Sequence, residues 1–275
     1  MKNLGYGFWH EKNGLDFVDY IELLEDNEKN KQTLNLTYAV RDGIISHCGE
    51  INENNLKPRA QFIDLNNYDS PNQFSPYTWE ACVVKIADKI SYIGRDIEDA
   101  ITVGVLDKNL TCLADFLKSN GVYEPINNTV LINSLVYDLC QNSSPENGLC
   151  FSPKAFSLIN KIKEFNYSNI YLSKRLQPSS KYFNLVLNQI YNTLFELYSG
   201  TNTITSLNNI TNYYPTLGNS FKDWLLTYWN INETCSNNII FDIANVDDYK
   251  KGILYYISGM TDNFAIDVYN EIIGF

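Results

Sequence analysis

Apolar residues recur three and four positions apart along most of this 275-residue chain. The longest such segment is residues 80–101, EACVVKIADKISYIGRDIEDAI. At about 100° per residue, a helix here gathers four isoleucines on one side: Ile86, Ile90, Ile93 and Ile97. The same periodicity marks residues 14–24, 36–47, 131–140, 155–165, 182–198, 221–229 and 248–260. The sequence therefore predicts an all-α fold.

The other side of the predicted helix at residues 80–101 is polar and mostly acidic. Within an arc of roughly 80° it carries Asp88, Tyr92, Asp96 and Asp99. This face either meets water, or lines a cavity in which Asp88 binds a hard or borderline cation while Tyr92 and Asp96 hydrogen-bond to a ligand. The spacing alone does not choose between these two interpretations.

Loops are predicted where Pro, Gly, Asn and Ser cluster, at residues 53–76, 141–148 and 200–209. Ser-Pro pairs favour helix starts, because Ser can cap the helix and Pro fits its first turn. The sequence predicts two such starts, at Ser75-Pro76 and at Ser152-Pro153. Gly259 and Asp262 are interpreted as the junction between two helices.

Charge and composition exclude several classes of protein. A net charge of −11 argues against an outer surface that binds nucleic acid or an anionic membrane. The sequence has no secretory signal at its start and no apolar run near the ~20 residues of a membrane span, so we expect a cytoplasmic location. The six cysteines lack zinc-finger spacing and are predicted to be reduced thiols without an assigned function.

Four segments, taken in order, resemble the HD-domain deoxynucleoside triphosphate triphosphohydrolases, the family of the bacterial deoxyguanosine triphosphate triphosphohydrolases. They are NLTYAVRDGIISHCGE, EACVVKIADKISYIGRDIEDAI, INSLVYDL and YYISGMTDNFAIDVYNEI. The most particular stretch is ISGMTDNFA at residues 257–265. The resemblance implies one HD-superfamily-like multi-helix domain over residues 1–275, with residues 1–110 as the remainder of the HD core and residues 111–275 as a helical part packed on it.

The resemblance also implies a reaction, the metal-assisted hydrolysis of a deoxynucleoside triphosphate to the deoxynucleoside and inorganic triphosphate. In the family, a His, a His-Asp pair and a later Asp hold a divalent Mn or Mg ion. The later Asp matches Asp88, within Ala87-Asp88-Lys89-Ile90. Tyr92 and Asp96 match family positions that contact the sugar of the nucleotide.

Further site residues follow from the same resemblance. Phe8-Trp9-His10-Glu11 resembles a stretch found downstream of the His-Asp pair, which makes His10 and Glu11 the catalytic candidates. The alternative interpretation is that His10 is a partly buried side chain at a frayed terminus, without a catalytic role. Arg175 is the candidate to bind phosphate in the basic segment near residues 161–181, where surface lysines are the alternative explanation.

The two histidines of the sequence, His10 and His47, do not lie in a His-Asp dipeptide. We interpret His47 as a residue that interacts with the C-terminal end of a helix, just before Gly49. Three of the four family metal ligands thus have no match, and we expect the chain to be inactive alone. It would be an N-terminally truncated product or one half of a split enzyme, completed by a partner polypeptide.

Two other functions remain open from the sequence. The chain could be a non-catalytic module that binds a nucleotide or joins hetero-oligomers, and homo-oligomers are also expected because missing helices would expose apolar surface. It could instead be an all-α phosphohydrolase whose metal site is built from acids alone. The latter needs a second helix with suitable acidic spacing, which the sequence does not offer near Asp88.

Overall fold

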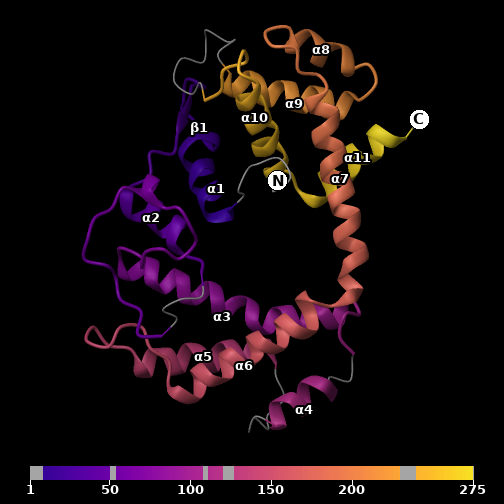
Figure 1. Cartoon of the computed structure of the whole chain (residues 1–275). Coiled ribbons are helices and arrows are strands. Elements are labelled where there is room, and N and C mark those ends of the chain that lie inside the picture. Colours follow the sequence, from indigo (N-terminus) through magenta and orange to yellow (C-terminus); the bar gives the residue numbers. More distant parts are fainter. Residues whose placement is uncertain (1–8, 50–53, 108–110, 120–126, 230–239, 275) are drawn as a thin grey trace. The chain divides into compact units, whose positions relative to one another are not determined.

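The computed structural model describes residues 9–49, 54–107, 111–119, 127–229 and 240–274 (Figure 1). It is mostly helical, which confirms the predicted all-α class. The chain forms two compact units: unit 1 contains residues 1–18 and 35–177, and unit 2 contains residues 19–34 and 178–275. The boundary expected at residue 110 therefore falls inside unit 1. No described helix is long and apolar enough to cross a membrane.

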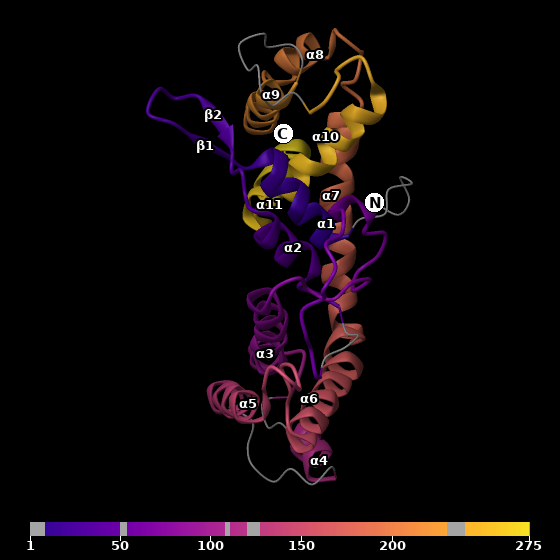
Figure 2. The same cartoon turned by 90° about the vertical axis from the view of Figure 1, so that its left-hand side faces the viewer.

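Unit 1 is built around one long helix, α3. Its helices are α1 (His10–Asp16), α2 (Tyr38–Ser46), α3 (Trp79–Thr102), α4 (Thr111–Ser119), α5 (Asn128–Asn142) and α6 (Pro153–Asn166). α3 contacts α2, α5 and α6, and α1 contacts α2; Figures 1 and 2 both show α5 and α6 alongside α3. The isoleucine side of α3 is buried against these helices, as predicted, and contributes Ile86, Ile90, Ile93 and Ile97 to the core.

The two predicted Ser-Pro helix starts have different outcomes. Ser152 caps α6, because its hydroxyl accepts the Ala155 N–H at 3.2 Å and Pro153 is the first helical residue. The start at Ser75-Pro76 is wrong: α3 begins after Thr78, whose hydroxyl accepts the Ala81 N–H at 3.2 Å. The carbonyls of Ser75 and Pro76 instead accept hydrogen bonds from Arg59, which holds them in the preceding loop.

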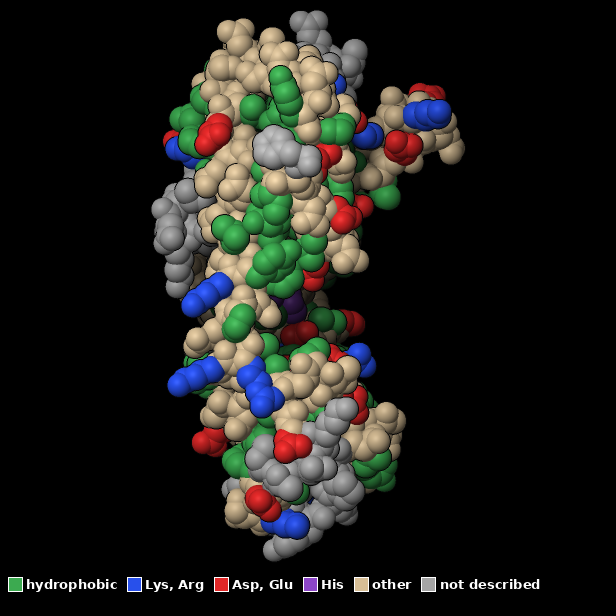
Figure 3. Space-filling model, turned by 90° about the vertical axis from the view of Figure 1, so that its right-hand side faces the viewer, with side chains coloured by type: hydrophobic (Ala, Val, Ile, Leu, Met, Phe, Trp, Pro, Cys, Tyr) green, Lys and Arg blue, Asp and Glu red, His purple; other side chains and the backbone are tan. Residues whose placement is uncertain are grey.

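Unit 2 contains a two-stranded antiparallel hairpin and five helices among its described residues. These elements are β1 (Leu23–Glu25), β2 (Lys31–Thr33), α7 (Gln177–Phe195, beginning at the unit boundary), α8 (Thr203–Ile210), α9 (Pro215–Tyr228), α10 (Val246–Ser258) and α11 (Asp262–Ile273). The hairpin pairs Leu23 with Thr33. Figure 3 shows the side of the molecule on which Figure 1 draws α7, and hydrophobic side chains (green) lie at this surface. The exposed hydrophobic residues of α7 include Tyr182, Phe183, Leu185 and Leu187.

Two element predictions are wrong. The single helix expected at residues 14–24 is shorter, because the chain passes through a π-helical turn, Phe17–Ile21, into β1. The carboxylate of Asp26 accepts two backbone N–H groups of the hairpin turn and stabilises it there. The loop expected at residues 200–209 contains α8, whose buried residues Thr203, Leu207 and Ile210 have helical spacing that the polar composition masked.

The predicted junction between two C-terminal helices is confirmed. α10 ends at Ser258 with Gly259 as its C-cap residue, and α11 begins at Asp262. The hydroxyl of Thr261 accepts the Phe264 N–H at 3.3 Å and caps α11. The segment ISGMTDNFA therefore has a structural explanation in unit 2.

Candidate functional site

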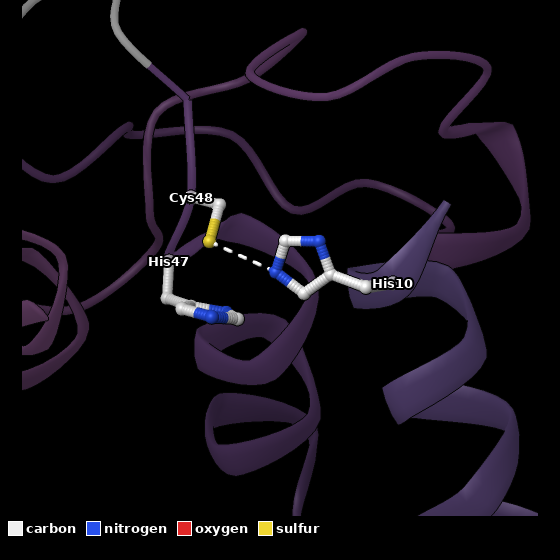
Figure 4. A group of neighbouring side chains, drawn as sticks. All are labelled: His10, His47 and Cys48. Atoms are coloured by element: carbon white, nitrogen blue, oxygen red, sulfur yellow. Dashed lines mark hydrogen bonds between the residues drawn. The ribbon is translucent and has the colours of Figure 1, made fainter. Parts of the chain in front are cut away.

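Three metal-ligating side chains of unit 1 converge at the ends of two helices. His10 is the first residue of α1, while His47 and Cys48 directly follow α2, which packs against α1. Their ligand atoms all lie within 4.8 Å of one another, and Figure 4 shows the three side chains facing one another. His10 Nε2 lies 3.2 Å from Cys48 Sγ. We call these three residues the His–Cys cluster.

The hydrogen-bond partners of the histidines determine which ring nitrogen is available. His47 Nδ1 donates to the backbone carbonyl of Ile44 at 2.7 Å, which leaves a lone pair on its Nε2. This contact, at the C-cap of α2, also confirms the predicted interaction of His47 with a helix end.

His10 has an acidic partner at the same ring position. Its Nδ1 lies 3.1 Å from Oε2 of the buried Glu11, at ion-pair distance although without the alignment of a hydrogen bond. A carboxylate only accepts, so the proton of a neutral His10 belongs on Nδ1 and its Nε2 faces Cys48. His10 therefore presents Nε2 to the cluster, and Nε2 is the ring nitrogen of His47 that is not used toward Ile44.

The surroundings of Cys48 keep its sulfur protonated. Burial, reinforced by the negative charges of Glu11 and Asp88, raises the pKa of the Cys48 thiol to about 12. The thiol faces three acceptors: His10 Nε2 at 3.2 Å, Asp88 Oδ2 at 3.9 Å and the carboxylate of Glu11. The buried ammonium of Lys85 donates to the Cys48 carbonyl at 2.8 Å and thereby fixes the backbone at the end of α2.

Asp88 and His10, predicted to lie beside one opening, are both neighbours of Cys48 although they are far apart in the sequence. Tyr92 and Asp96 lie one and two helical turns beyond Asp88 on α3, and all three side chains are partly exposed. The carboxylate of Asp96 accepts a hydrogen bond from the Tyr171 hydroxyl. Contact of Tyr92 and Asp96 with a sugar stays a prediction.

Arg175 lies in a different part of unit 1. Its exposed guanidinium donates to the carbonyl of Gly104, just beyond the C-terminal end of α3. At 1.5 Å per residue, about 20 Å of helix separates Asp88 from that end. The structure thus brings Arg175 near neither the His–Cys cluster nor Asp88, and a phosphate contact by Arg175 stays a prediction.

The donors described around Asp88 do not fit the hard cations expected from the resemblance. The family set contains two histidines and two carboxylates, whereas the cluster next to Asp88 offers two imidazoles and a thiol, a soft donor that Mg²⁺ and Mn²⁺ bind poorly. Such a donor set suits Zn²⁺ and similar borderline ions. The sequence analysis did not identify Cys48 or His47 as candidate metal ligands. The feature of the sequence that could have indicated them is the His47-Cys48 dipeptide directly after a predicted helix.

The comparisons with known proteins place the chain near one group. No family model matches the sequence. The chain is 26% identical to a deoxyguanosinetriphosphate triphosphohydrolase-like protein of Rickettsia bellii (strain RML369-C), over 97% of this chain and 67% of the relative. A protein of the same name from Clostridium perfringens (strain SM101 / Type A) is also 26% identical, over 97% of this chain and 60% of the relative.

A protein of the same name from Clostridium tetani (strain Massachusetts / E88) is 26% identical over 93% of this chain and 58% of the relative. The chain thus spans about three fifths to two thirds of the relatives' length. It is a distant relative, along nearly its whole length, of proteins named deoxyguanosinetriphosphate triphosphohydrolase-like.

Proposed function

We propose that this chain is a deoxynucleoside triphosphate triphosphohydrolase-like protein of the HD type. The main observation behind the proposal is that His10 and Asp88 both lie next to Cys48. His10 Nε2 is 3.2 Å and Asp88 Oδ2 is 3.9 Å from the Cys48 sulfur. The resemblance assigns these two residues to one active site without using the structure. The distant similarity to proteins of that name supports the same reaction, hydrolysis of dGTP or another dNTP to a deoxynucleoside and triphosphate.

In this proposal His10 and Glu11 act as a pair. The carboxylate of Glu11, 3% exposed and 3.1 Å from His10 Nδ1, orients the imidazole so that Nε2 faces the reacting groups. A histidine held this way can accept or donate a proton at Nε2 in general acid–base catalysis. Tyr92 and Asp96 contact the sugar. Arg175 is left out of this arrangement, because about 20 Å of helix separates Asp88 from the end of α3 where Arg175 lies.

The 275 residues alone are proposed not to complete the reaction. The family's first His and His-Asp pair have no counterpart in this sequence, and Asp88 is the one matched metal ligand. A family member uses its divalent metal to stabilise phosphate charge and activate water. We propose that a partner polypeptide, or a linked segment, supplies the missing ligands, and that the protein works in the cytoplasm.

Release of inorganic triphosphate from dGTP, with and without added Mn²⁺, tests this function. We expect no turnover by the 275-residue chain, and turnover after the corresponding His…His-Asp segment of a relative is fused to Met1 or added as a separate polypeptide. In the completed protein Asp88→Asn should abolish turnover. The matched control is Asp99→Asn on the same helix, which removes only an exposed pair with Arg95 and should leave turnover unchanged. Turnover by the chain alone would contradict the proposal.

A non-catalytic nucleotide-binding or oligomer-forming module is the second candidate, favoured by the lack of a His-Asp dipeptide in the sequence. Equilibrium dialysis of dGTP separates the two. If the completed protein shows no turnover but the chain binds dGTP, and Asp96→Asn weakens that binding while Asp99→Asn does not, the module is the better description. Binding lost equally in both variants would place the nucleotide elsewhere.

A further inference from the structure

We propose that His10, His47 and Cys48 form a binding site for Zn²⁺ or a similar borderline transition-metal ion. The ligands are Nε2 of each histidine and Sγ of Cys48, and a fourth ligand such as water completes the tetrahedron. The inference rests on side-chain geometry and needs no hydrolysis. It is an alternative to the proton-transfer role proposed for His10, because Nε2 cannot hold a metal ion and exchange a proton at the same time. It also differs from the metal site that the resemblance implies, in which Asp88 is a ligand and the ion is Mn²⁺ or Mg²⁺.

The distances between the ligand atoms agree with tetrahedral zinc. Zinc–nitrogen bonds of about 2.0–2.1 Å and zinc–sulfur bonds of about 2.3 Å place two ligand atoms of one tetrahedron roughly 3.3–3.7 Å apart. His10 Nε2 and Cys48 Sγ lie 3.2 Å apart, and all three ligand atoms lie within 4.8 Å of one another. Closing the remaining gap needs a movement on the order of 1 Å. The His10 side chain, 62% exposed, has room for it.

The partners of the other ring nitrogens pre-orient both histidines. A zinc-binding histidine typically donates its second N–H to a backbone carbonyl or a carboxylate. Here His47 Nδ1 meets the Ile44 carbonyl at 2.7 Å, and His10 Nδ1 meets Glu11 Oε2 at 3.1 Å. Glu11 is 3% exposed, and its carboxylate lies beside both His10 Nδ1 and the Cys48 thiol. It would offset part of the charge of a bound cation.

Charge and proton balance favour the same ion. Binding forms a zinc–sulfur bond and breaks the S–H bond of Cys48, and the proton leaves to solvent. Two neutral imidazoles and one thiolate leave a single positive charge on the complex. The carboxylate of Asp88, 3.9 Å from the sulfur, lies close enough to offset that charge. Mg²⁺ gains little from sulfur and imidazole donors.

Metal titration of the full 275-residue chain tests the site. After chelator treatment, the chain is loaded with Co²⁺, whose thiolate charge-transfer absorption reports a Co–S bond, and the Co²⁺ is then displaced by Zn²⁺. We expect one ion per chain and no displacement by excess Mg²⁺. Cys48→Ser should remove the absorption and weaken Zn²⁺ binding more than about 100-fold, and Glu11→Gln should weaken it about 10- to 100-fold. Cys140→Ser, at an exposed thiol, is the control and should change neither.

Three results would overturn the inference: no bound ion, an absorption that persists in Cys48→Ser, or equal losses in Cys140→Ser. Circular dichroism of the metal-free variants checks the fold. If Cys48→Ser does not fold, His10→Gln, at an exposed position, carries the test and should weaken Zn²⁺ binding to a similar extent. The titration uses no nucleotide. Failure to bind zinc would therefore not contradict the proposed hydrolysis, and a lack of triphosphate release would not contradict the zinc site.

Discussion

Two polar clusters lie along α2, and they differ in how fully their atoms are satisfied. In the first, the carboxylate of Asp42 is 0% exposed and both oxygens have partners. One accepts a hydrogen bond from the guanidinium of Arg59, and the other accepts the Tyr77 N–H at 2.7 Å. Arg59 also donates to the Tyr38 hydroxyl at 2.7 Å. We call these four residues the Asp42 cluster; it attaches the loop before α3 to α2.

The second is the His–Cys cluster at the end of the same helix. Its shared contact is a weak one between His10 Nε2 and Cys48 Sγ, and His47 hydrogen-bonds to the backbone through Nδ1, which leaves Nε2 for a ligand. A buried, saturated cluster has no capacity left for a ligand and acts through stability. A partly exposed cluster with spare lone pairs can take one. The comparison teaches that the partners of each atom, more than residue type, separate a structural cluster from a candidate site.

The largest effect is expected where the saturated cluster is broken. Asp42→Ala leaves the Arg59 guanidinium, 10% exposed, without its charge partner. Breaking a buried ion pair costs about 3–5 kcal/mol, so we expect a loss of that size in the free energy of unfolding, measured with urea. Asp99→Asn, whose pair with Arg95 is exposed, is the control and should cost less than about 0.5 kcal/mol. Equal losses would refute the structural role of the Asp42 cluster.

Zinc should stabilise the chain through the other cluster. An ion that binds only the folded state adds about 2.7 kcal/mol to the free energy of unfolding at a concentration 100 times its dissociation constant. Urea unfolding with and without Zn²⁺ measures this increment, which Cys48→Ser should remove. Stabilisation of the same size in Cys48→Ser would show that zinc acts elsewhere.

Thiol labelling at different pH values tests the environment of Cys48 in the His–Cys cluster. Because burial and nearby carboxylates raise the pKa of Cys48 to about 12, little thiolate exists at pH 8, and its fraction grows as the pH rises. The greater nucleophilicity of a high-pKa thiolate offsets part of this deficit. We expect iodoacetamide to label Cys48 tens of times more slowly at pH 8 than an exposed thiol such as Cys140, measured by peptide mass spectrometry.

The labelling rate of Cys48 should rise with pH well beyond pH 9, and bound zinc should suppress it. A rate at pH 8 equal to that of Cys140 would contradict the protected environment that the structure gives Cys48.

The smallest effect is expected at a helix cap outside both clusters. Ser152→Ala removes the hydroxyl that accepts the Ala155 N–H and donates to Asp138 Oδ2 at 2.6 Å. Loss of such a cap costs about 1 kcal/mol, measured by urea unfolding. Ser168→Ala, at an exposed position, is the matched control and should cost less than the capping variant. A change in zinc affinity in Ser152→Ala would mean that the two regions are coupled.

Elements with strong helical periodicity were predictable from the sequence, as α3 and its four buried isoleucines show. The misses are local. The helix start at Ser75-Pro76 failed because Arg59 binds those carbonyls, a contact made across the loop. The helix α8 was not predicted because one of its buried residues, Thr203, is polar, so the apolar periodicity of the segment is incomplete.

For the candidate site, the sequence by itself determined the residue types, the helix that carries Asp88, Tyr92 and Asp96, and the resemblance that singled out His10. It also determined that no His-Asp dipeptide is present in these residues. These features follow from periodicity and motif, which are local properties of a chain. Only the tertiary structure decided that His10, His47 and Cys48 meet and that Asp88 lies beside their sulfur. The reason is that packing of α1 and α3 on α2 sets these distances, and packing depends on contacts between segments far apart in sequence.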